Sequence, residues 1–548
     1  MKYVLFLVIT VSLSFAFIPW SFRYQSTADL FEDDYDLLFD PARISEIEGS
    51  RVYTSLSNFV TGTENLFSNN GMPFILIGGS TDLVYPNPGF VYDLSSRKTG
   101  LFTGLLDPYG NFLYGEGEVT DITWNDDDDN GVYDRRTIET EQRTAYSKNN
   151  EADYFIAIGA KRNNLRWGLG FMRNEYGNTY TNPVNNFNYE YTEEDLTSAS
   201  YTLIQRASST GNSIYSVTSN NLILSVWLDR DNWSLGLKTG YGMFSWGNEE
   251  IIFADSVIYT YPEDSLSGDY TNADILDSLN APQSGSRIPV YLTLFYNYNE
   301  NAQGRFYLGF STESHKYSDD ALGYYAKTRE NIYDEFTRNY DTTYTYYSGS
   351  GNTKTITAGT KHLWKINPRF NFGIGVLFTT ASITDSTAYN DVVTSVEVYD
   401  DNDGQTIDPD DYIQTIWSSE TWMTRSTGSV KSLTFPVGVE FFVLNPSLCL
   451  RLGAVHTLTF TDITTVHQMI QFEPERTRIE YGDGTVNETM EDPGYSSGYE
   501  ETQTETTPGT DYVFGLGWQV NKNLQIDLMG FTDLTDMTNW RISATLKL

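Results

Sequence analysis

The sequence predicts an all-β protein: a transmembrane antiparallel β-barrel of about 14 strands, or alternatively about 16, with an N-terminal plug (hatch) segment. Three observations carry this prediction. Many segments alternate between large apolar and small or polar residues, short and long connections also alternate, and only the first residues form a long apolar run. The 40 Tyr, 31 Phe and 43 Gly agree with it, because aromatic residues favour strands and Gly is poor in helices.

The chain begins with the features of a secretory signal peptide. Lys2 gives a positive start, an apolar stretch follows, and Ser14-Phe15-Ala16 has the small-x-small pattern of a cleavage site. We therefore predict a signal peptide over residues 1–16. A retained anchor helix is the alternative, although the apolar run is short for a membrane span and meets Pro19. No later segment has about 18 uninterrupted apolar residues, so we expect no transmembrane helix in the mature chain.

The alternation defines strands about 10 residues long, the length that a tilted strand needs to cross a bilayer. In each strand one set of side chains is apolar and the set between them is small or polar, as expected for a wall between lipid and a lumen. The apolar sets are Trp233, Leu235, Leu237, Thr239, Tyr241 and Met243; Phe370, Phe372, Ile374, Val376 and Phe378; Leu433, Phe435, Val437, Val439, Phe441 and Val443; and Tyr512, Phe514, Leu516, Trp518 and Val520.

The connections between these strands differ in length. We expect short turns at 163–164, 229–232, 299–304, 365–368, 445–447 and 521–523, and long polar loops at 174–212, 247–286, 317–342, 386–429 and 464–510. Tight turns at one rim and long loops at the other are the layout of bacterial outer-membrane barrels. The sequence therefore predicts a barrel over residues 51–548 with long acidic surface loops, in the outer membrane of a diderm bacterium and surrounded by its lipid.

The strand count follows from the turns. Six hairpins give about twelve strands, and the last nine residues alternate up to Leu548, so they form one more. Such a closing strand is what outer-membrane proteins present to the barrel assembly machinery. Because single-chain barrels need an even number, Arg51 to Val60 is expected to be the strand that makes fourteen. Phe74 to Gly79 would belong to a further pair, giving sixteen.

The alternate set of side chains would face the lumen. It holds charges of both signs, among them Lys161, Arg166, Lys238, Glu440, Arg451, Asp527, Arg541 and Lys547. An isolated buried charge is expensive, so this wall needs water or a partner. Many glycines in the same set leave room beside the wall. Residues 17–50, between the cleavage site and the first strand, are the candidate plug.

The plug candidate carries a recognisable motif. An acidic stretch from Asp29 to Asp40 leads to Asp40-Pro41-Ala42, shortly before Arg51. This resembles the N-terminal hatch of the FadL family of outer-membrane long-chain fatty-acid transporters, in which an Asn-Pro-Ala motif precedes the first strand. Here Asp replaces Asn. The alternative interpretation is a turn before a strand, a common use of Asp-Pro.

The resemblance implies a function. FadL-like proteins bind a hydrophobic ligand in the lumen and release it sideways through the wall as the hatch shifts, which implies passive transport of hydrophobic compounds such as long-chain fatty acids. It also implies a plug or gating role for Asp40, Pro41 and Ala42. Two alternatives stay open. One is a non-transporting scaffold for surface attachment or protein secretion, whose loops contact surface proteins, and the other is a porin for polar solutes.

The net charge of -38 argues against nucleic acid as a partner, because a polyanion would be repelled. The acidic run at 125–134 places Asp126, Asp128 and Asn130 before Gly131 with the alternate spacing of calcium loops, with Asp134 as a further ligand. Asp401 and Asp403 form a looser second version. We expect no required cofactor, and Ca²⁺ in these surface loops is a hypothesis whose alternative is an ordinary solvated acidic loop.

We do not expect an enzyme. Catalysis needs a nucleophile or base held by a partner, and the four histidines show no such motif. The single cysteine, Cys449, excludes an internal disulfide and is expected to be a small packing residue.

Overall fold

The computed structural model describes residues 21–57, 74–99, 115–126, 132–181, 187–196, 200–260, 270–280, 283–330, 336–400, 410–444, 447–491, 498–530 and 541–548. The expected signal peptide at 1–16 lies outside this part. The N-terminal segment contains the helix α2 (Phe22–Ser26) and the 3-10 helices η1 (Asp36–Phe39) and η2 (Pro41–Glu46). Among the described residues, none of the helices is long and apolar enough to cross a membrane.

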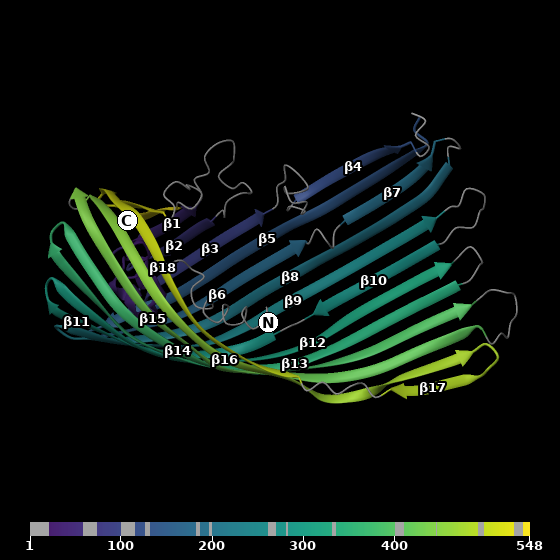
Figure 1. Ribbon diagram of the computed structural model, residues 1–548. Coiled ribbons are helices and arrows are strands. Elements are labelled where there is room, and N and C mark those ends of the chain that lie inside the picture. The colour runs from purple at the N-terminus through teal and green to yellow at the C-terminus, as the bar shows by residue number, and fades with distance from the viewer. Residues whose placement is uncertain are drawn as a thin grey trace.

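All other regular elements are strands (Figure 1). They are β1 (Arg51–Ser57), β2 (Phe74–Ser80), β3 (Asn87–Thr99), β4 (Gly115–Asn125), β5 (Arg135–Arg162), β6 (Leu165–Thr181), β7 (Phe187–Asp195), β8 (Ser200–Asp229), β9 (Trp233–Thr260), β10 (Tyr270–Asn280), β11 (Gln283–Asn299), β12 (Ala302–Glu330), β13 (Phe336–Asn367), β14 (Phe370–Asp400), β15 (Tyr412–Leu444), β16 (Leu448–Tyr481), β17 (Val486–Glu491), β18 (Tyr499–Asn521), β19 (Leu524–Gly530) and β20 (Arg541–Lys547).

In the described part of the chain, sixteen strands close an antiparallel barrel. The ring runs β1, β2, β3, β5, β6, β8, β9, β11, β12, β13, β14, β15, β16, β18, β19 and β20. β20 pairs with β1, with Arg51 opposite Lys547. The expectation of 14 strands is therefore wrong and the alternative of 16 is confirmed: β2 and β3 are the additional pair. β4, β7, β10 and β17 extend the sheet at its far end.

The alternation places the two faces as expected. On β15 and β16, Phe441 and Leu452 are 45% and 59% exposed, whereas their neighbours Glu440 and Arg451 are 0% and 5% exposed. The exposed apolar side chains form a belt around the barrel, which is the surface that lipid covers in a transmembrane barrel. Glu440 and Arg451 face the lumen, as do Gly438 and Gly453, which lie against the N-terminal segment.

The short turns lie at the expected places, but the long polar segments differ from the expectation. Most of 386–429 and 464–510 is strand rather than loop, and β13 to β16 have 32, 31, 33 and 34 residues. Thr and Tyr, abundant in these segments, favour a strand, and each strand continues the hydrogen-bond ladder of its neighbour. The wall therefore extends well beyond the length that a bilayer needs, as Figure 1 shows for the right-hand half of the sheet.

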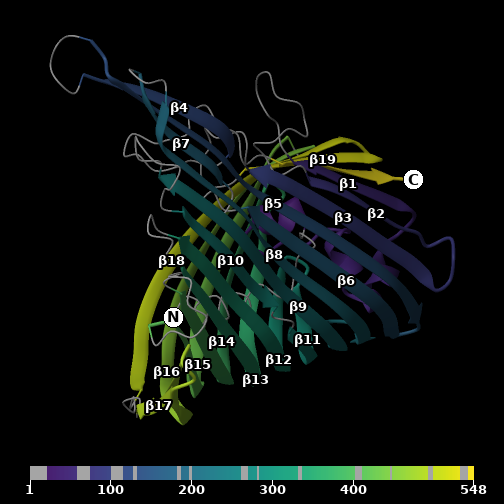
Figure 2. The same cartoon turned by 90° about the vertical axis from the view of Figure 1, so that its right-hand side faces the viewer.

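The N-terminal segment supplies the core of the barrel. Its residues Tyr35, Leu38, Phe39 and Ile44 are buried against Phe155 and other wall residues in one hydrophobic cluster. Figure 2 shows this purple segment behind β3, β5 and β6. The segment is thus packed within the ring of strands, where we expected a plug.

Candidate functional site

The plug folds back on itself around one buried carboxylate. Ser21 caps α2 by accepting a hydrogen bond from the Tyr24 backbone N–H, at 3.0 Å. The Ser21 backbone N–H and hydroxyl both donate to Asp36, at 2.7 and 2.6 Å. Asp36 also accepts from the Asp33 N–H at 2.8 Å, so it ties the start of α2 to η1. The plug is therefore a compact unit with its own polar contacts.

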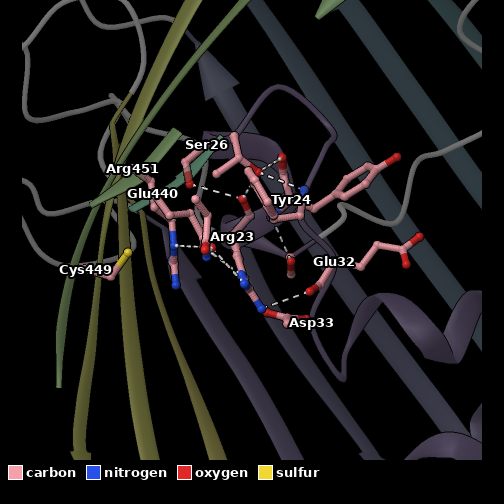
Figure 3. A network of polar contacts seen from close by, with 12 residues as sticks. Arg23, Tyr24, Ser26, Glu32, Asp33, Glu440, Cys449 and Arg451 are labelled. Atoms are coloured by element: carbon pink, nitrogen blue, oxygen red, sulfur yellow. Dashed lines mark hydrogen bonds and ion pairs between the residues drawn. The ribbon is translucent and has the colours of Figure 1, made fainter. Parts of the chain in front are cut away.

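A buried ionic network joins the beginning of the plug to β15, β16 and β19 (Figure 3). Arg23 donates to both oxygens of Glu440, from Nε at 2.7 Å and from Nη2 at 2.8 Å. Glu440 also lies 3.3 Å from Arg451, which forms an ion pair with Asp527. The Glu440 side chain is 1% exposed. One wall carboxylate thus binds a plug cation and a wall cation at once.

A second ionic contact holds the middle of the plug. Glu32 lies 3.1 Å from Arg43 of the plug and 3.1 Å from Arg305 of β12. Burial alone would raise the pKa of Glu32, but Arg305 and Arg43 outweigh it and lower the pKa to about 2. On the neighbouring strand β13, the Lys361 ammonium donates to the Asp29 carbonyl at 2.6 Å. The plug and the wall therefore neutralise each other's charges.

The Asp40-Pro41-Ala42 motif lies against β8, β5 and β6. Trp227 Nε1 donates to the Asp40 carboxylate at 2.7 Å, and the Ala42 N–H donates to the Ser225 hydroxyl at 2.7 Å. Next to the motif, Lys238 donates to the Phe39 carbonyl at 2.9 Å. These contacts fix the motif at the wall.

Glycines make this close approach possible. A Cβ on Gly159 of β5 would overlap the Pro41 carbonyl, and a Cβ on Gly168 of β6 would overlap the Pro41–Ala42 peptide. Backbone cannot move aside as a flexible side chain can, so only Gly fits at these two wall positions. The motif is thus seated by shape as well as by hydrogen bonds.

An apolar cavity of about 100 Å³ adjoins the end of the plug. Phe39 of η1 forms one side, and Phe155, Met172 and Ile223 of the inner wall form others. The lining also includes Leu222 and Tyr241, which are 50% and 46% exposed on the outer face. The cavity therefore lies between the plug and the part of the wall whose outer face carries these two exposed side chains.

The wall beside this cavity has an interrupted hydrogen-bond ladder. β9 and β11 pair up to Arg287 and resume at Val290, with no pairs for Ile288 and Pro289. Proline has no N–H to donate, which accounts for the break. A similar break occurs between β14 and β15, next to Pro436. Only the break at Pro289 has its proline among the residues that line the cavity.

Above the plug, the inner face of the long strands carries a ladder of aromatic rings. His467 of β16 stacks on Trp422 of β15 with ring centroids 4.7 Å apart, and lies 5.1 Å from Tyr499 of β18. Tyr389 of β14 lies 6.0 Å from His467 and also 6.0 Å from Tyr347 of β13. The ladder crosses five strands in the direction perpendicular to them, and it belongs to the same alternating series as the lumen-facing residues.

The structure brings together some of the residues that we singled out and not others. Asp40, Pro41 and Ala42 lie together at the wall, and Lys238, Glu440, Arg451 and Asp527 contact the plug or one another. Sequence reasoning missed Arg23, Glu32 and Arg305. Arg305 could have been found, because it occupies a lumen-facing position in an alternating strand. Cys449 is buried, as a packing residue would be.

The calcium hypothesis remains a prediction. Asp128, Asn130, Asp401 and Asp403 lie outside the described residues. Of the other two, Asp126 follows β4, and the Asp134 N–H donates to the Asn125 carbonyl at 2.9 Å. This contact brings the ends of the acidic run together, which is compatible with a ligand loop and with a plain turn.

The fold and the site together define a class: a closed antiparallel barrel with its own N-terminal segment packed in the lumen. No protein-family model matches the chain, and no curated protein matches it. Among solved structures, the chain is similar to the Pseudomonas putida toluene transporter TodX, with 11% identity and a TM-score of 0.33 over 96% of this chain and 98% of that one. It is also similar to a Pseudomonas aeruginosa FadL homologue, with 10% identity and a TM-score of 0.25 over 97% and 99%.

The chain is also similar to the outer-membrane transporter YddB from Escherichia coli, with 9% identity and a TM-score of 0.27 over 91% of this chain and 80% of that one. These alignments extend over most of each chain, at low identity and low TM-score. The fold and what the protein does are therefore argued from the geometry of this chain.

Proposed function

We propose that the protein is an outer-membrane barrel for the passive transport of hydrophobic compounds, for which long-chain fatty acids are one cargo class. The observation that carries the proposal is the cavity between the plug residue Phe39 and the wall of β8 and β9, whose outer face carries the exposed Leu222 and Tyr241. A hydrophobic compound in this cavity can move into the bilayer without crossing water, because its path ends on an apolar surface.

Two further features support this path. The aromatic ladder formed by Tyr389, Trp422, His467 and Tyr499 offers an apolar strip on the inner face above the plug, suited to first capture. The interruption in the strand pairing at Pro289 lies where the cavity meets the wall. Fewer hydrogen bonds have to be broken there to part β9 from β11. In the proposed route, the compound passes from the aromatic ladder to the cavity and then through the wall into the bilayer. A shift of the plug opens this route.

The test is uptake by proteoliposomes of a radiolabelled long-chain fatty acid and, separately, of a small aromatic hydrocarbon. We expect Pro289→Ala, which restores the missing N–H donor, to slow the uptake of the compound that is carried. Pro436→Ala is the matched control, because it alters the other break, away from the cavity. If empty and protein-containing liposomes take up both compounds equally, the transport proposal is wrong.

The second candidate is a surface scaffold, and the observation that favours it is strand length. β13 to β16 exceed 30 residues, whereas about 10 suffice to cross a bilayer, so a large sheet projects beyond the membrane. A scaffold would leave uptake unchanged on removal of the gene but would remove a partner protein from the cell surface. A porin would instead conduct small polar solutes, which ion conductance across a planar bilayer measures.

A further inference from the structure

Four exposed basic side chains lie on the outer face of neighbouring strands. They are Lys316 of β12, Lys354 of β13, and Arg425 and Lys431 of β15. Each belongs to the outward-facing series of its strand: Lys316 follows the exposed Phe310 in that series, and Lys354 precedes the exposed Ile356. Within the described part of the chain, none of the four forms an ion pair. We call these four residues the cationic patch.

The patch begins at the border of the apolar belt. On β13 the belt runs from Ile366, 59% exposed, to Ile356, 48% exposed. Ten residues at about 3.3 Å each, in a strand tilted by about 40°, span roughly 25 Å of height, which is the height of the apolar band in such barrels. Lys354 is the next outward residue after Ile356. The short turns lie at the opposite end of the strands, so this border is the one toward the long, external side.

The strand register arranges the four cations as the corners of a frame. Lys316 pairs with Ser350, Ser350 pairs with Ser386, and Ser386 pairs with Arg425. Lys316 and Arg425 are therefore three strand spacings apart, about 14 Å. Closer to the belt, Lys354 pairs with Ser382, which pairs with Ser429, and Lys431 is the next outward residue after Ser429.

Small polar side chains fill the frame. Ser350 and Ser386 lie between the upper cations, and the next outward row consists of Ser314, Asn352, Thr384 and Thr427. Three residues of this row, together with Lys316 and Arg425, line a hollow of about 780 Å³. His315 and Asp385, which belong to the inward-facing series, also contribute to its lining. The surface is therefore recessed and rich in hydroxyl groups, with cations at its edges.

The cationic patch is unusual in a chain with this excess of acidic residues. The protein has 73 acidic and 35 basic residues. However, none of the outward-facing residues from Arg425 to Lys431 on β15 is acidic, and neither are the residues paired with them across β14, β13 and β12. The nearest outward one is Asp462 of β16, opposite Ser429. Unpaired cations beside an apolar belt are the arrangement that attracts anionic headgroups.

We propose that the cationic patch binds the phosphorylated headgroup of a glycolipid in the outer leaflet of the membrane. The inference rests on the proposed outer-membrane location. Arg425 offers the planar pair of N–H groups that binds phosphate in two places, and the three lysines supply point charges. The serine, threonine and asparagine side chains can hydrogen-bond sugar hydroxyls between the phosphates. The acyl chains of the same lipid then lie along the belt below Ile356 and Phe310.

The test uses the full-length protein purified in detergent and a bisphosphorylated glycolipid, with retained lipid measured by native mass spectrometry. The patch variant carries Lys316→Gln, Lys354→Gln, Arg425→Gln and Lys431→Gln. We expect it to bind the glycolipid at least about tenfold more weakly than the unaltered protein, because four charge-assisted contacts are lost. The matched control removes four exposed cations at the short-turn rim, by Arg230→Gln, Lys365→Gln, Arg369→Gln and Lys522→Gln, and is expected to bind normally.

Three outcomes would overturn the proposal. They are equal binding by the patch variant and the unaltered protein, equal binding of the dephosphorylated glycolipid, and displacement of the glycolipid by low-millimolar inorganic phosphate, which would identify a free-anion site. Uptake of hydrophobic compounds is measured in the same preparations. Loss of glycolipid binding with uptake retained supports the patch, and absent uptake with glycolipid still bound rejects only the transport proposal.

Discussion

The two ends of the plug differ in how many linked charges hold them to the barrel. At its beginning, Arg23 forms a buried ion pair with Glu440 in a network of charges (Figure 3). At its far end, the Pro41–Ala42 peptide packs against Gly159 and Gly168, and the Ala42 N–H donates to Ser225 of β8. Trp227 of β8 donates to the neighbouring Asp40 carboxylate. Both kinds of contact occur at each end, because Thr27 and Ala28 pack on Gly438 and Gly453 near Arg23, and Glu46 pairs with Arg166 near Ala42. The Arg23 end differs in its network of linked charges around the buried Glu440.

This difference indicates which end can be released. A buried ion pair is strongly destabilised when one partner loses its charge, because the other charge stays buried without compensation. Close packing of backbone on glycine does not respond to charge and changes only when the surfaces separate. We therefore expect the Arg23 end to open and the Asp40-Pro41-Ala42 end to stay fixed as the hinge.

The largest effect is expected from Glu440→Gln. The substitution keeps the shape but leaves Arg23 and part of Arg451 without a countercharge, which should weaken plug docking by about 3 to 5 kcal/mol. Hydrogen exchange of residues 21–30 should rise while that of 38–44 changes little. The control is Glu480→Gln, because its ion pair with Arg478 is about half exposed and should contribute less than about 1 kcal/mol. Equal exchange at both ends of the plug in Glu440→Gln would contradict the comparison.

Lowering the pH should also weaken the docking of the plug, by protonating a carboxylate that holds it. The pKa of Glu32 is lowered to about 2 from an ordinary 4.5. Its contribution to docking is therefore complete above about pH 4.5 and is lost as the pH falls toward 2. The loss should be on the order of 3 kcal/mol. Plug exchange measured between pH 5 and pH 2.5 should show it.

Glu32→Gln separates this effect from the other carboxylates. At pH 5 the plug of the variant should be docked more weakly than that of the unaltered protein. Its hydrogen exchange should also change less with pH. If both proteins show the same pH profile, Glu32 is not the group that couples the plug to Arg305.

At the packed end, Gly168→Ala should have an intermediate effect. Its Cβ would overlap the Pro41–Ala42 peptide, and overpacking of this kind costs about 1 to 3 kcal/mol. Gly177→Ala is a control on the same strand, because a Cβ there meets nothing within 4 Å. Here exchange should rise at 38–44 first. A rise confined to 21–30 would show that the hinge is at the other end.

The features of the fold that the sequence predicts are those that depend on residues close together in the chain. Alternation is local, so it located most of the membrane-crossing strands and their facing. Phe74 to Gly79 was only the alternative that gives sixteen, and its partner β3 was not located. Alternation could not give the length of β13 to β16. Polar, Thr-rich segments are equally compatible with loops and with a sheet that has water on both faces. Only the pairing between strands determines which of the two forms.

The site was predictable only where the wall itself carries the signal. Lys238, Glu440 and Arg451 were found because a charge in a lumen-facing position demands a partner. The identity of that partner was not predictable. Arg23 and Glu440 are far apart in the sequence, and nothing local to Glu32 points to Arg305. The seating of Pro41 on Gly168 likewise depends on a contact between distant segments.

The smallest effect is expected from Ser225→Ala, which tests the hydrogen bond at the packed end alone. The variant removes the hydroxyl that accepts the Ala42 N–H and leaves that donor unpaired at a fully buried position, which should cost about 1 kcal/mol. Ser216→Ala, at an exposed position of the same strand, is the control. Because Gly168 and Ser225 hold the same peptide, the double variant should fall short of the sum of the two single effects. If the effects add fully, or if Ser225→Ala loosens 21–30 instead of 38–44, the Pro41–Ala42 peptide is not the fixed point about which the plug moves.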